Sequence, residues 1–242
     1  MQSTTDPASD LTAIVLCGGK GERLKPFTDA IPKPLVLLNN RPLLEHLLHY
    51  LSASGVHRFI LCVGYKAELI EQFVREKRDP RWDIRCVNSG DAGMIDRILD
   101  ASEGLAGPAL ICYGDTLANV DIDDLRATHR NNNALATVTV YRLHSPFGIV
   151  EIDDAARVSA FAEKPVLPHW INIGFLLCEP GAFAHMRRGS DLPEYLSMLA
   201  REKLLFAYRH QGRHLTVNTE KDRQAAEAAM VEFVTLMDDV KL

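Results

Sequence analysis

Long hydrophobic runs, blocks of basic residues and closely paired cysteines are all missing from this 242-residue sequence. Without a run of about 20 apolar residues, no segment predicts a membrane-spanning helix. Without a basic block, and with a net charge of -5, the chain does not fit a general binder of nucleic acids or anionic membranes. A small anionic substrate can still meet a local basic cluster, so that class of ligand stays open.

The cysteines do not form the framework of a secreted protein. They are odd in number, contain no CxxC pair and lie mostly inside apolar runs, which predicts buried reduced thiols in a cytosolic protein. Residues 1–10, MQSTTDPASD, lack the basic start and apolar centre of a signal peptide. We therefore expect a cytoplasmic protein with a disordered tail over residues 1–10. The five cysteines are Cys17, Cys62, Cys86, Cys112 and Cys178.

The composition is that of an ordinary globular domain. Hydrophobic residues make up 47% of the chain and charged residues 24%, which excludes disordered, collagen-like and fibrous classes. The sequence shows no internal repeat, low-complexity segment or linker, and no hexapeptide repeat of the kind that forms a β-helix. One domain over residues 11–242 is therefore the expected organisation.

Strand and helix patterns alternate through the first half of the chain. Residues 13–17, AIVLC, form a short apolar run that is typical of a buried parallel strand. Residues 42–53 carry a leucine stripe at helical spacing, and Gly55 ends it. The alternation predicts an α/β fold with one doubly wound, mostly parallel sheet and helices on both faces. The further segments are strands at 59–63, 84–87 and 109–113 and helices at 67–76 and 94–101.

The second half changes to strands separated by short turns. These segments predict a mixed or antiparallel extension of the same sheet, whose edge strands are free to pair with a second copy or to be covered. Helices at 180–186, 192–202 and 220–236 and a strand at 205–210 complete the expected order. The strand-like segments are 134–141, 148–152, 158–163 and 170–178.

A glycine-rich loop follows the first strand, at the end of a parallel strand where open α/β sheets place ligands. Its glycines let backbone N–H groups approach phosphates closely. Four cations stand against two acids between Lys20 and Lys33, which favours a phosphate site over the alternative of a structural turn with solvated lysines. The glycines are Gly18, Gly19 and Gly21, and the cations are Lys20, Arg23, Lys25 and Lys33.

Two familiar phosphate motifs do not fit this loop. A Walker A motif needs Ser or Thr after the Gly-Lys step, and here Gly21 follows Lys20. The dinucleotide fingerprint needs a glycine where Leu24 stands, and no acid ends the second strand, where Val63-Gly64 is found. An NAD(P)-binding oxidoreductase is therefore disfavoured.

The stretch GGKGERLKPFTDAIPKPL, from Gly18 to Leu35, resembles the signature of the sugar-1-phosphate nucleotidyltransferases. The resemblance extends from about Leu11 to the final helix and implies a Rossmann-like fold. It also implies that Arg23 and Lys33 are catalytic and bind the nucleotide phosphates. The nucleotide site implied by the resemblance comprises Leu16, Gly18, Gly19, Gly21, Arg23, Lys33, Ser89 and Gly90.

The same resemblance implies a metal site and a sugar-phosphate site. Asp115, in the segment CYGDTLANVDI and at the tip of the apolar strand that this segment ends, corresponds to the catalytic aspartate that binds Mg²⁺ in the family. Asn218 stands where many members have a second aspartate, and a role as N-cap of the final helix is its alternative. An exposed charge pair is the alternative for Glu163 and Lys164. The sugar-phosphate residues implied by the resemblance are Gly148, Glu163, Lys164 and Asn172.

Within this family the chain is most similar to glucose-1-phosphate cytidylyltransferase, through the segments FILCVGYKAELI, NSGDAGMIDRIL and CYGDTLANVDI. The resemblance implies transfer of a nucleotidyl group from a nucleoside triphosphate to a sugar 1-phosphate, with CTP and glucose 1-phosphate as the expected pair. Guanylyl-, uridylyl- and thymidylyltransferases stay open, as does a non-catalytic subunit that binds nucleotide sugars. No histidine falls in a matched motif, and no nucleic-acid or membrane partner is expected.

Overall fold

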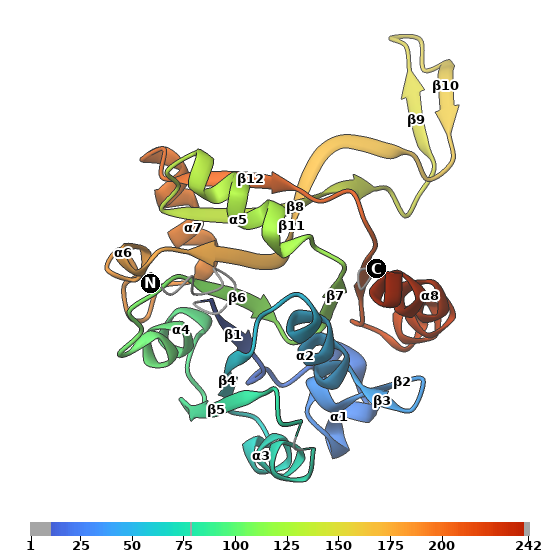
Figure 1. The fold of residues 1–242 in the computed structure, drawn as a ribbon. Helices are drawn as coiled ribbons and strands as arrows, with labels where there is room; N and C mark the ends of the chain where they lie inside the picture. The colour runs from blue at the N-terminus through green and yellow to red at the C-terminus, as the bar shows by residue number, and fades with distance from the viewer. Residues whose placement is uncertain (1–10, 78, 240–242) are drawn as a thin grey trace.

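The computed structural model describes residues 11–77 and 79–239. Their centre is a seven-stranded sheet, with strands β12, β8, β11, β6, β1, β4 and β5 in that spatial order (Figure 1). The last four of these run parallel to one another, whereas β11 is antiparallel to both β6 and β8. In chain order the bounds are β1 Thr12–Leu16, β4 Arg58–Val63, β5 Asp83–Asn88, β6 Ala109–Tyr113, β8 Ala136–His144, β11 Val166–Cys178 and β12 Leu205–Arg209.

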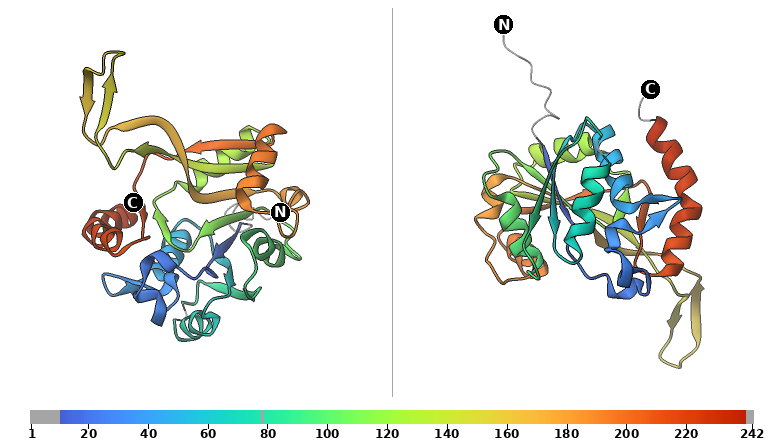
Figure 2. Two further views of the ribbon diagram at one scale, coloured as in Figure 1. Left: turned by 180° about the vertical axis from the view of Figure 1, so that it is seen from behind. Right: turned by 90° about the horizontal axis from the view of Figure 1, so that it is seen from below.

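Helices cover both faces of this sheet (Figure 2). Successive strand residues point to opposite faces, so Ala13 and Val15 join one apolar core while Ile14 joins the other. The leucine stripe of α2 lies in the first core, as its helical spacing predicts. The first face carries α2 Leu43–Ala53, α3 Ala67–Glu76 and α5 Ile122–Asn131, and the second carries α4 Met94–Ser102, α6 Pro180–Phe183 and α7 Leu192–Arg201. Helix α8, Glu220–Asp239, lies beside the sheet (Figure 1) and adds Ala226 and Met230 to the first core.

The expected fold class is confirmed, and one helix longer than a single turn was missed. Helix α5 begins with three aspartates in four residues, a composition that reads as a turn. In the structure Asp121 caps this helix, because its carboxylate accepts a hydrogen bond from the backbone N–H of Asp124 at 2.9 Å. Only Ile122, Leu125 and His129 of α5 are buried, too few for a clear helical stripe.

Two of the expected sheet additions do not join the main sheet. Strands β9 Ile149–Ile152 and β10 Val158–Ala162 pair only with each other. They form a hairpin that projects from the body in both views of Figure 2. We call residues 147–166 the arm. The chain leaves the sheet after β8, which is where the prediction of one continuous extension was wrong.

Short elements connect the strands around the edge where β1, β4, β5 and β6 end. They are η2 Glu22–Leu24, α1 Phe27–Ala30, η3 Lys33–Leu35, β2 Leu37–Leu38, β3 Arg41–Pro42, β7 Thr116–Ala118 and β13 His214–Thr216.

The described cysteines are free thiols, and all but Cys86 are buried. The predicted tail, residues 1–10, lies outside the described residues. Among the helices that are described, none has the length and apolarity needed to cross a membrane.

Candidate active site

An open cleft of about 660 Å³ lies at the carboxyl ends of the parallel strands. Such edges are the usual ligand sites of open α/β sheets, because loops from several strands meet there. Eight of the predicted site residues line this cleft: Leu16, Gly18, Gly19, Gly21, Arg23, Lys33, Asp115 and Asn218.

The glycine loop packs so closely against the segment that follows it that Gly21 leaves no room for a larger residue. Gly21 has φ +63, in the left-handed region, and a Cβ there would lie 2.9 Å from the Thr28 methyl and 3.1 Å from the Lys33 Cβ. The Thr28 hydroxyl donates a hydrogen bond to the Gly21 carbonyl at 3.0 Å. The loop therefore folds back on the segment that carries Lys33. Arg23, by contrast, is exposed and has no polar partner within the described chain, so its guanidinium is free to meet a phosphate.

Lys33 is the centre of the polar contacts in the cleft. Its Nζ donates hydrogen bonds to Asp115 Oδ2 at 2.6 Å and to Asn218 Oδ1 at 3.0 Å. Lys33 is only 8% exposed, so this ion pair is partly desolvated and stronger than a surface pair. One ammonium, one carboxylate and one amide together carry no net charge.

Asp115 and Asn218 come together through a short antiparallel ribbon. Strand β7 follows Asp115 directly, and β13 precedes Asn218 by one residue. Thr116 pairs with Thr216 in this ribbon. The ribbon thus carries the end of β13 to the end of β6, and the two side chains meet at Lys33.

The alternative role of Asn218 as a helix cap is taken by its neighbour. The Thr219 hydroxyl accepts a hydrogen bond from the backbone N–H of Asp222, and the Asp222 carboxylate accepts one from the N–H of Thr219. This reciprocal pair closes the first turn of α8. The side chain of Asn218 is therefore available to the cleft.

Sequence reasoning missed Arg97, a buried arginine of α4 that lines the same cleft. Its guanidinium donates hydrogen bonds to the carbonyls of Val63 at 2.7 Å, Gly90 at 2.7 Å and Ala92 at 2.9 Å. Within the described residues it forms no ion pair with a carboxylate. Arg97 therefore ties together the loops that follow β4 and β5.

The glycines around Arg97 were the sequence signal from which its position could have been found. A Cβ on Gly18 would lie 2.0 Å from the Arg97 guanidinium, and a Cβ on Gly64 would lie 2.4 Å from it. Glycines at the ends of two neighbouring strands therefore make room for one large side chain. The sequence shows the glycines but not which residue occupies the space.

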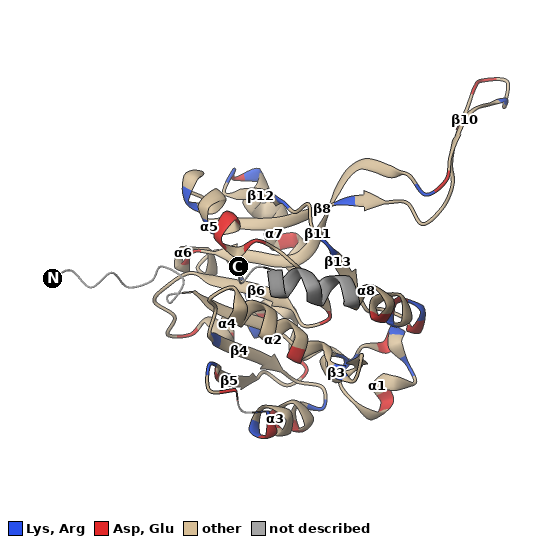
Figure 3. Ribbon diagram, turned by 45° about the vertical axis from the view of Figure 1, so that its right-hand side comes forward, with Lys and Arg blue, Asp and Glu red and all other residues tan. Residues whose placement is uncertain are grey.

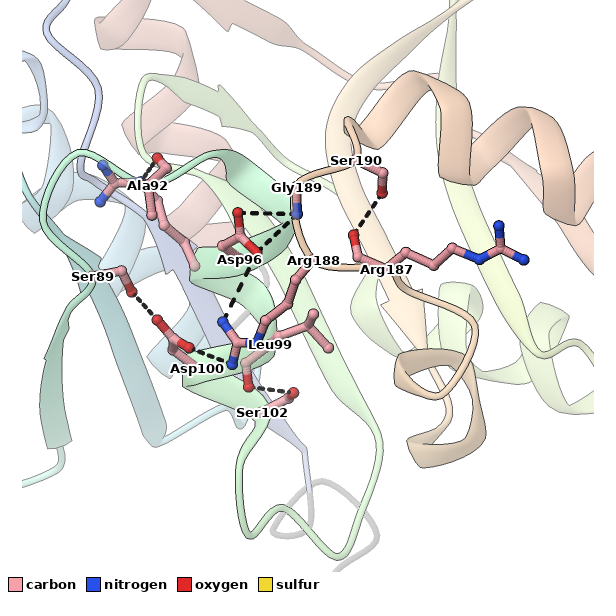
Figure 4. A network of polar contacts seen from close by, with 11 residues as sticks. Ser89, Ala92, Asp96, Leu99, Asp100, Ser102, Arg187, Arg188, Gly189 and Ser190 are labelled. Carbon is pink, nitrogen blue, oxygen red and sulfur yellow. Dashed lines mark hydrogen bonds and ion pairs between the residues drawn. The ribbon is translucent and has the colours of Figure 1, made fainter.

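Ser89 and Gly90, which were predicted to bind the nucleotide, do not line the cleft. The Ser89 hydroxyl donates a hydrogen bond to Asp100 at 2.6 Å, and Arg188 donates one to the same carboxylate at 2.7 Å (Figure 4). These hydrogen bonds lower the pKa of Asp100. Gly189 N–H contacts Asp96 on the same helix, so Ser89 belongs to a network that joins α4 to the loop before α7. The cleft is instead lined by the four residues that follow Gly90, Asp91 to Met94.

The predicted sugar-phosphate residues do not line the cleft. Glu163 and Lys164 lie in the arm, 3.8 Å apart, with side chains 63% and 66% exposed. Gly148 faces the same segment, because a Cβ there would lie 2.7 Å from the Phe161 ring and 3.0 Å from Glu163 Oε2. The arrangement seen is the exposed charge pair, with Gly148 beside it.

Asn172 connects to the cleft through Tyr113. Tyr113 lines the cleft. Burial raises the pKa of this tyrosine, and the nearby Asn172 side chain opposes that rise. The Asn172 Oδ1 also accepts the N–H of Gly174 at 2.8 Å. Gly174 has φ +82 and packs against the Tyr113 ring, where a Cβ would lie 2.6 Å from a ring carbon. Asn172 thus supports the wall of the cleft.

Asp115 and Asn218 fit a hard divalent cation as a partial ligand set. Their oxygens converge on one position, since both are within hydrogen-bonding distance of a single ammonium nitrogen. The described residues contain no group of three or more His, Cys, Asp or Glu that could hold a metal. Mg²⁺ commonly takes one or two carboxylates and completes its shell with substrate phosphates and water, so the donor set here suits an ion that arrives with a phosphate ligand.

Comparison with known proteins agrees with this geometry. The Nucleotidyl transferase family profile matches residues 12–222. The chain belongs to the nucleotidyl transferase family. A protein of Bacillus subtilis (strain 168), named as a probable glucose-1-phosphate cytidylyltransferase, is 32% identical over 237 residues, covering 88% of this chain and 93% of the relative. The chain is a sugar-1-phosphate nucleotidyltransferase and an enzyme of class EC 2.7.7.

Other relatives in the family are named after a different nucleotide and a different sugar. The mannose-1-phosphate guanylyltransferase catalytic subunit beta of Danio rerio is 29% identical over 225 residues, which cover 88% of this chain but 62% of that protein. A solved structure of UDP-glucose pyrophosphorylase complexed with UDP-glucose superimposes with a TM-score of 0.70 at 16% identity, covering 91% of this chain and 98% of that one. At that identity the structural likeness supports the nucleotidyltransferase fold alone.

Proposed function

We propose that this enzyme transfers the cytidylyl group of CTP to glucose 1-phosphate, or to a closely related sugar phosphate, and releases pyrophosphate. The observation that carries the proposal is the cleft in which the glycine loop faces Lys33, Asp115 and Asn218. The choice of CTP and glucose 1-phosphate is supported by the 32% identical Bacillus subtilis relative.

The reaction forms one bond and breaks one at the same phosphorus. A phosphate oxygen of the sugar phosphate attacks the α-phosphorus of the triphosphate in line, and the bond from that phosphorus to the β-phosphate oxygen breaks. A sugar phosphate is already ionised near neutral pH, because its second pKa is about 6. The nucleophile therefore needs no general base, and catalysis consists of positioning and charge neutralisation.

The residues of the cleft divide this work. The glycine-loop amides and Arg23 hold the β- and γ-phosphates and stabilise the pyrophosphate as it leaves. Lys33 neutralises the α-phosphate, within a site that already holds its ammonium against Asp115. Arg97 fixes the loops after β4 and β5, and so positions the lining residues Asp91 to Met94 beside the nucleotide. Lys164 and Glu163 bind the phosphate and hydroxyls of the sugar phosphate.

Asp115 and Asn218 would hold a divalent cation, Mg²⁺ in this proposal, together with the substrate phosphates. When bound it neutralises charge on the triphosphate and so reduces the repulsion between two polyanionic substrates. Asn218 contributes an oxygen without a formal charge. Of this pair, Asp115 is then the charged ligand.

Pyrophosphate release from a matrix of substrates tests this proposal. CTP, UTP, dTTP, GTP and ATP are each combined with several sugar 1-phosphates and Mg²⁺, and pyrophosphate is measured in a coupled assay. We expect CTP with glucose 1-phosphate to give the highest kcat/KM. Preference for GTP with mannose 1-phosphate is the second candidate, supported by the 29% identical guanylyltransferase relative, and that result would replace the proposed pair.

A further inference from the structure

Two arginine side chains lie against one exposed tryptophan on the main sheet. The Cζ atom of Arg142 is 4.2 Å from the centroid of the Trp170 ring, and the Cζ atom of Arg209 is 5.5 Å from it. All three residues are exposed, and they come from the neighbouring strands β8, β11 and β12. We call Arg142, Trp170 and Arg209 the arginine–tryptophan patch.

The register of the strands places this patch on one face of the sheet together with Asn172. On β11, Trp170 lies opposite Arg142 of β8. Two residues further along β11, Asn172 lies opposite Val140, and Arg209 of β12 flanks Val140 from the other side. Residues directly opposite one another share a face, and so do residues two apart along a strand. The patch and Asn172 therefore form one continuous surface.

The patch lies between the cleft and the arm. On one side, the Asn172 side chain is near Tyr113, which lines the cleft. On the other side, β11 begins at Val166, two residues after Lys164. Residues two apart on one face of a strand are separated by about 7 Å, so a single pyranose ring can lie over Trp170 and still reach Asn172. In Figure 3, blue marks basic residues on β8, close to where the arm leaves the body, and at the base of the arm.

The two arginines of the patch lack an acidic partner. Within the part of the chain that the structure describes, neither Arg142 nor Arg209 forms an ion pair or a hydrogen bond. Other exposed arginines do: Arg157 and Arg188 each meet an aspartate, at 2.8 and 2.7 Å. Like charges held against one ring repel each other, and an anion bound between them removes that repulsion.

We propose that the arginine–tryptophan patch binds a second anionic group, a carboxylate or a phosphate, on the sugar phosphate acceptor. This inference rests on the proposed function and narrows its acceptor. Lys164 already meets the phosphate on C1, so two further cations exceed what that group needs. A guanidinium binds carboxylate and phosphate oxygens in a bidentate manner, and the exposed part of the Trp170 ring offers an apolar surface to the sugar. Among acceptors without a second charge, glucose 1-phosphate stays the expected one.

Three acceptors that share the glucose ring test the proposal. Glucose 1-phosphate, glucuronic acid 1-phosphate and glucose 1,6-bisphosphate differ at C6, which carries a hydroxyl, a carboxylate or a phosphate. We measure kcat/KM with the nucleoside triphosphate that reacts fastest in the substrate matrix. At least one anionic acceptor should exceed glucose 1-phosphate about 10-fold or more, the effect of a charge-assisted hydrogen bond, and which one does so identifies the group. If neither exceeds it, the inference is overturned, while turnover of glucose 1-phosphate leaves the proposed reaction standing.

A double variant, Arg142→Gln with Arg209→Gln, links this preference to the patch. Its ratio of kcat/KM for the preferred anionic acceptor to that for glucose 1-phosphate should fall to about one, because the charge-assisted hydrogen bonds are lost. The matched control is Arg75→Gln with Arg201→Gln, which removes two exposed arginines in the last turns of α3 and α7 and changes the net charge equally. A double variant that keeps the wild-type ratio, or a control that loses it equally, overturns the assignment.

Calorimetric binding gives a readout that needs no turnover. If no pair in the substrate matrix reacts, the proposed function fails, and the affinities of the wild-type protein for the three sugar phosphates then decide the inference by themselves. Measured with Mg²⁺ and without nucleotide, at least one of the two anionic acceptors should bind more tightly than glucose 1-phosphate, and the double variant should remove the difference. Equal affinity of the wild type for all three overturns the patch as a binding site.

Discussion

The cleft and the arm hold the two sets of residues assigned to the two substrates, and they are built in opposite ways. In the cleft, Lys33 is 8% exposed and Arg97 6%, and each is fixed by two or three hydrogen bonds to other parts of the fold. In the arm, Glu163 and Lys164 are mostly exposed and contact one another.

This difference indicates how the site is prepared for each substrate. Hydrogen bonds hold Lys33, and through Arg97 the loops after β4 and β5, in place before the nucleotide arrives, which reduces the entropy lost on binding. The arm lacks that support in a single copy of the chain. The nucleotide side should therefore be rigid and sensitive to core changes, and the sugar-phosphate side adjustable and sensitive to surface changes.

The largest expected effect is on Lys33. Lys33→Ala removes the ammonium that meets Asp115 and should lower kcat by about 10²- to 10³-fold, the usual loss for a group that neutralises developing charge. Asp115→Ala should have an effect of similar size. Pyrophosphate release measures the loss, and Lys25→Ala is the control, since Lys25 is exposed and lies 3.6 Å from the exposed Asp29. Near-normal turnover in Lys33→Ala would exclude it from catalysis.

Replacement of Arg97 tests whether the cleft depends on its buried support. Arg97→Ala leaves three carbonyls without their donor and should reduce the free energy of unfolding by roughly 3 kcal/mol. It should also raise KM for the nucleotide, because the loops after β4 and β5 lose their common tie. Urea unfolding and steady-state kinetics check both effects. Arg85→Ala serves as control, because this exposed arginine donates a single hydrogen bond, to the Ala101 carbonyl; an equal loss in both variants would contradict the role of Arg97.

The arm is tested by Lys164→Ala. We expect KM for the sugar phosphate to rise about 10-fold, the effect of one charge-assisted phosphate contact, while KM for the nucleotide is unchanged. Lys203→Ala is a matched control, since both lysines are exposed and both have positive φ, +46 and +60. Parallel changes in the two KM values would show that Lys164 does not distinguish the substrates.

Asn218→Asp tests the charge balance at Lys33. A second carboxylate gives the site a net negative charge, so the free protein should bind Mn²⁺, used as a probe, about 10-fold more tightly. Electron paramagnetic resonance in the absence of nucleotide measures this affinity. Asn119→Asp, a change of the same kind outside the cleft, is the control. Unchanged binding would mean that residue 218 does not face the metal.

The smallest effect concerns His214, the first residue of β13 in the ribbon that leads to Asn218. Burial lowers the pKa of His214 to about 4, and its ring lies 5.4 Å from that of Tyr141. The unfolded chain binds this proton near pH 6.5 and the folded chain only near pH 4, so stability is complete above about 6.5 and falls as pH drops through that interval.

His214→Phe should therefore reduce the loss of stability between about pH 7 and pH 5 in urea unfolding. The exposed His169→Gln should leave the wild-type pH dependence unchanged. An identical pH dependence in His214→Phe and the wild type would contradict the assignment to His214.

Sequence reasoning predicted the parts of the site that depend on neighbouring residues. The apolar run of β1 followed by Gly18 and Gly19 indicated the position of the cleft, and the family resemblance indicated Lys33 and Asp115. It could not reveal Arg97, because the partners of this side chain are backbone carbonyl groups. Every residue carries such a group, so these contacts leave no signal in the sequence. The catalytic roles of the cleft and arm residues, the single domain and the cytoplasmic location stay predictions.

The sequence by itself determined the alternation of strands and helices, because the spacing of apolar residues is a local property of each segment. It also determined the kinds of groups available to bind phosphates. The family resemblance implied that Asn218 and Asp115 share one site, but only the tertiary structure showed how they meet, through a ribbon of three residues on each side that is too short to show a period. Only the tertiary structure showed that the arm leaves the sheet. The residue pattern of β9 and β10 predicts strands with an apolar face, but it does not indicate which element covers that face.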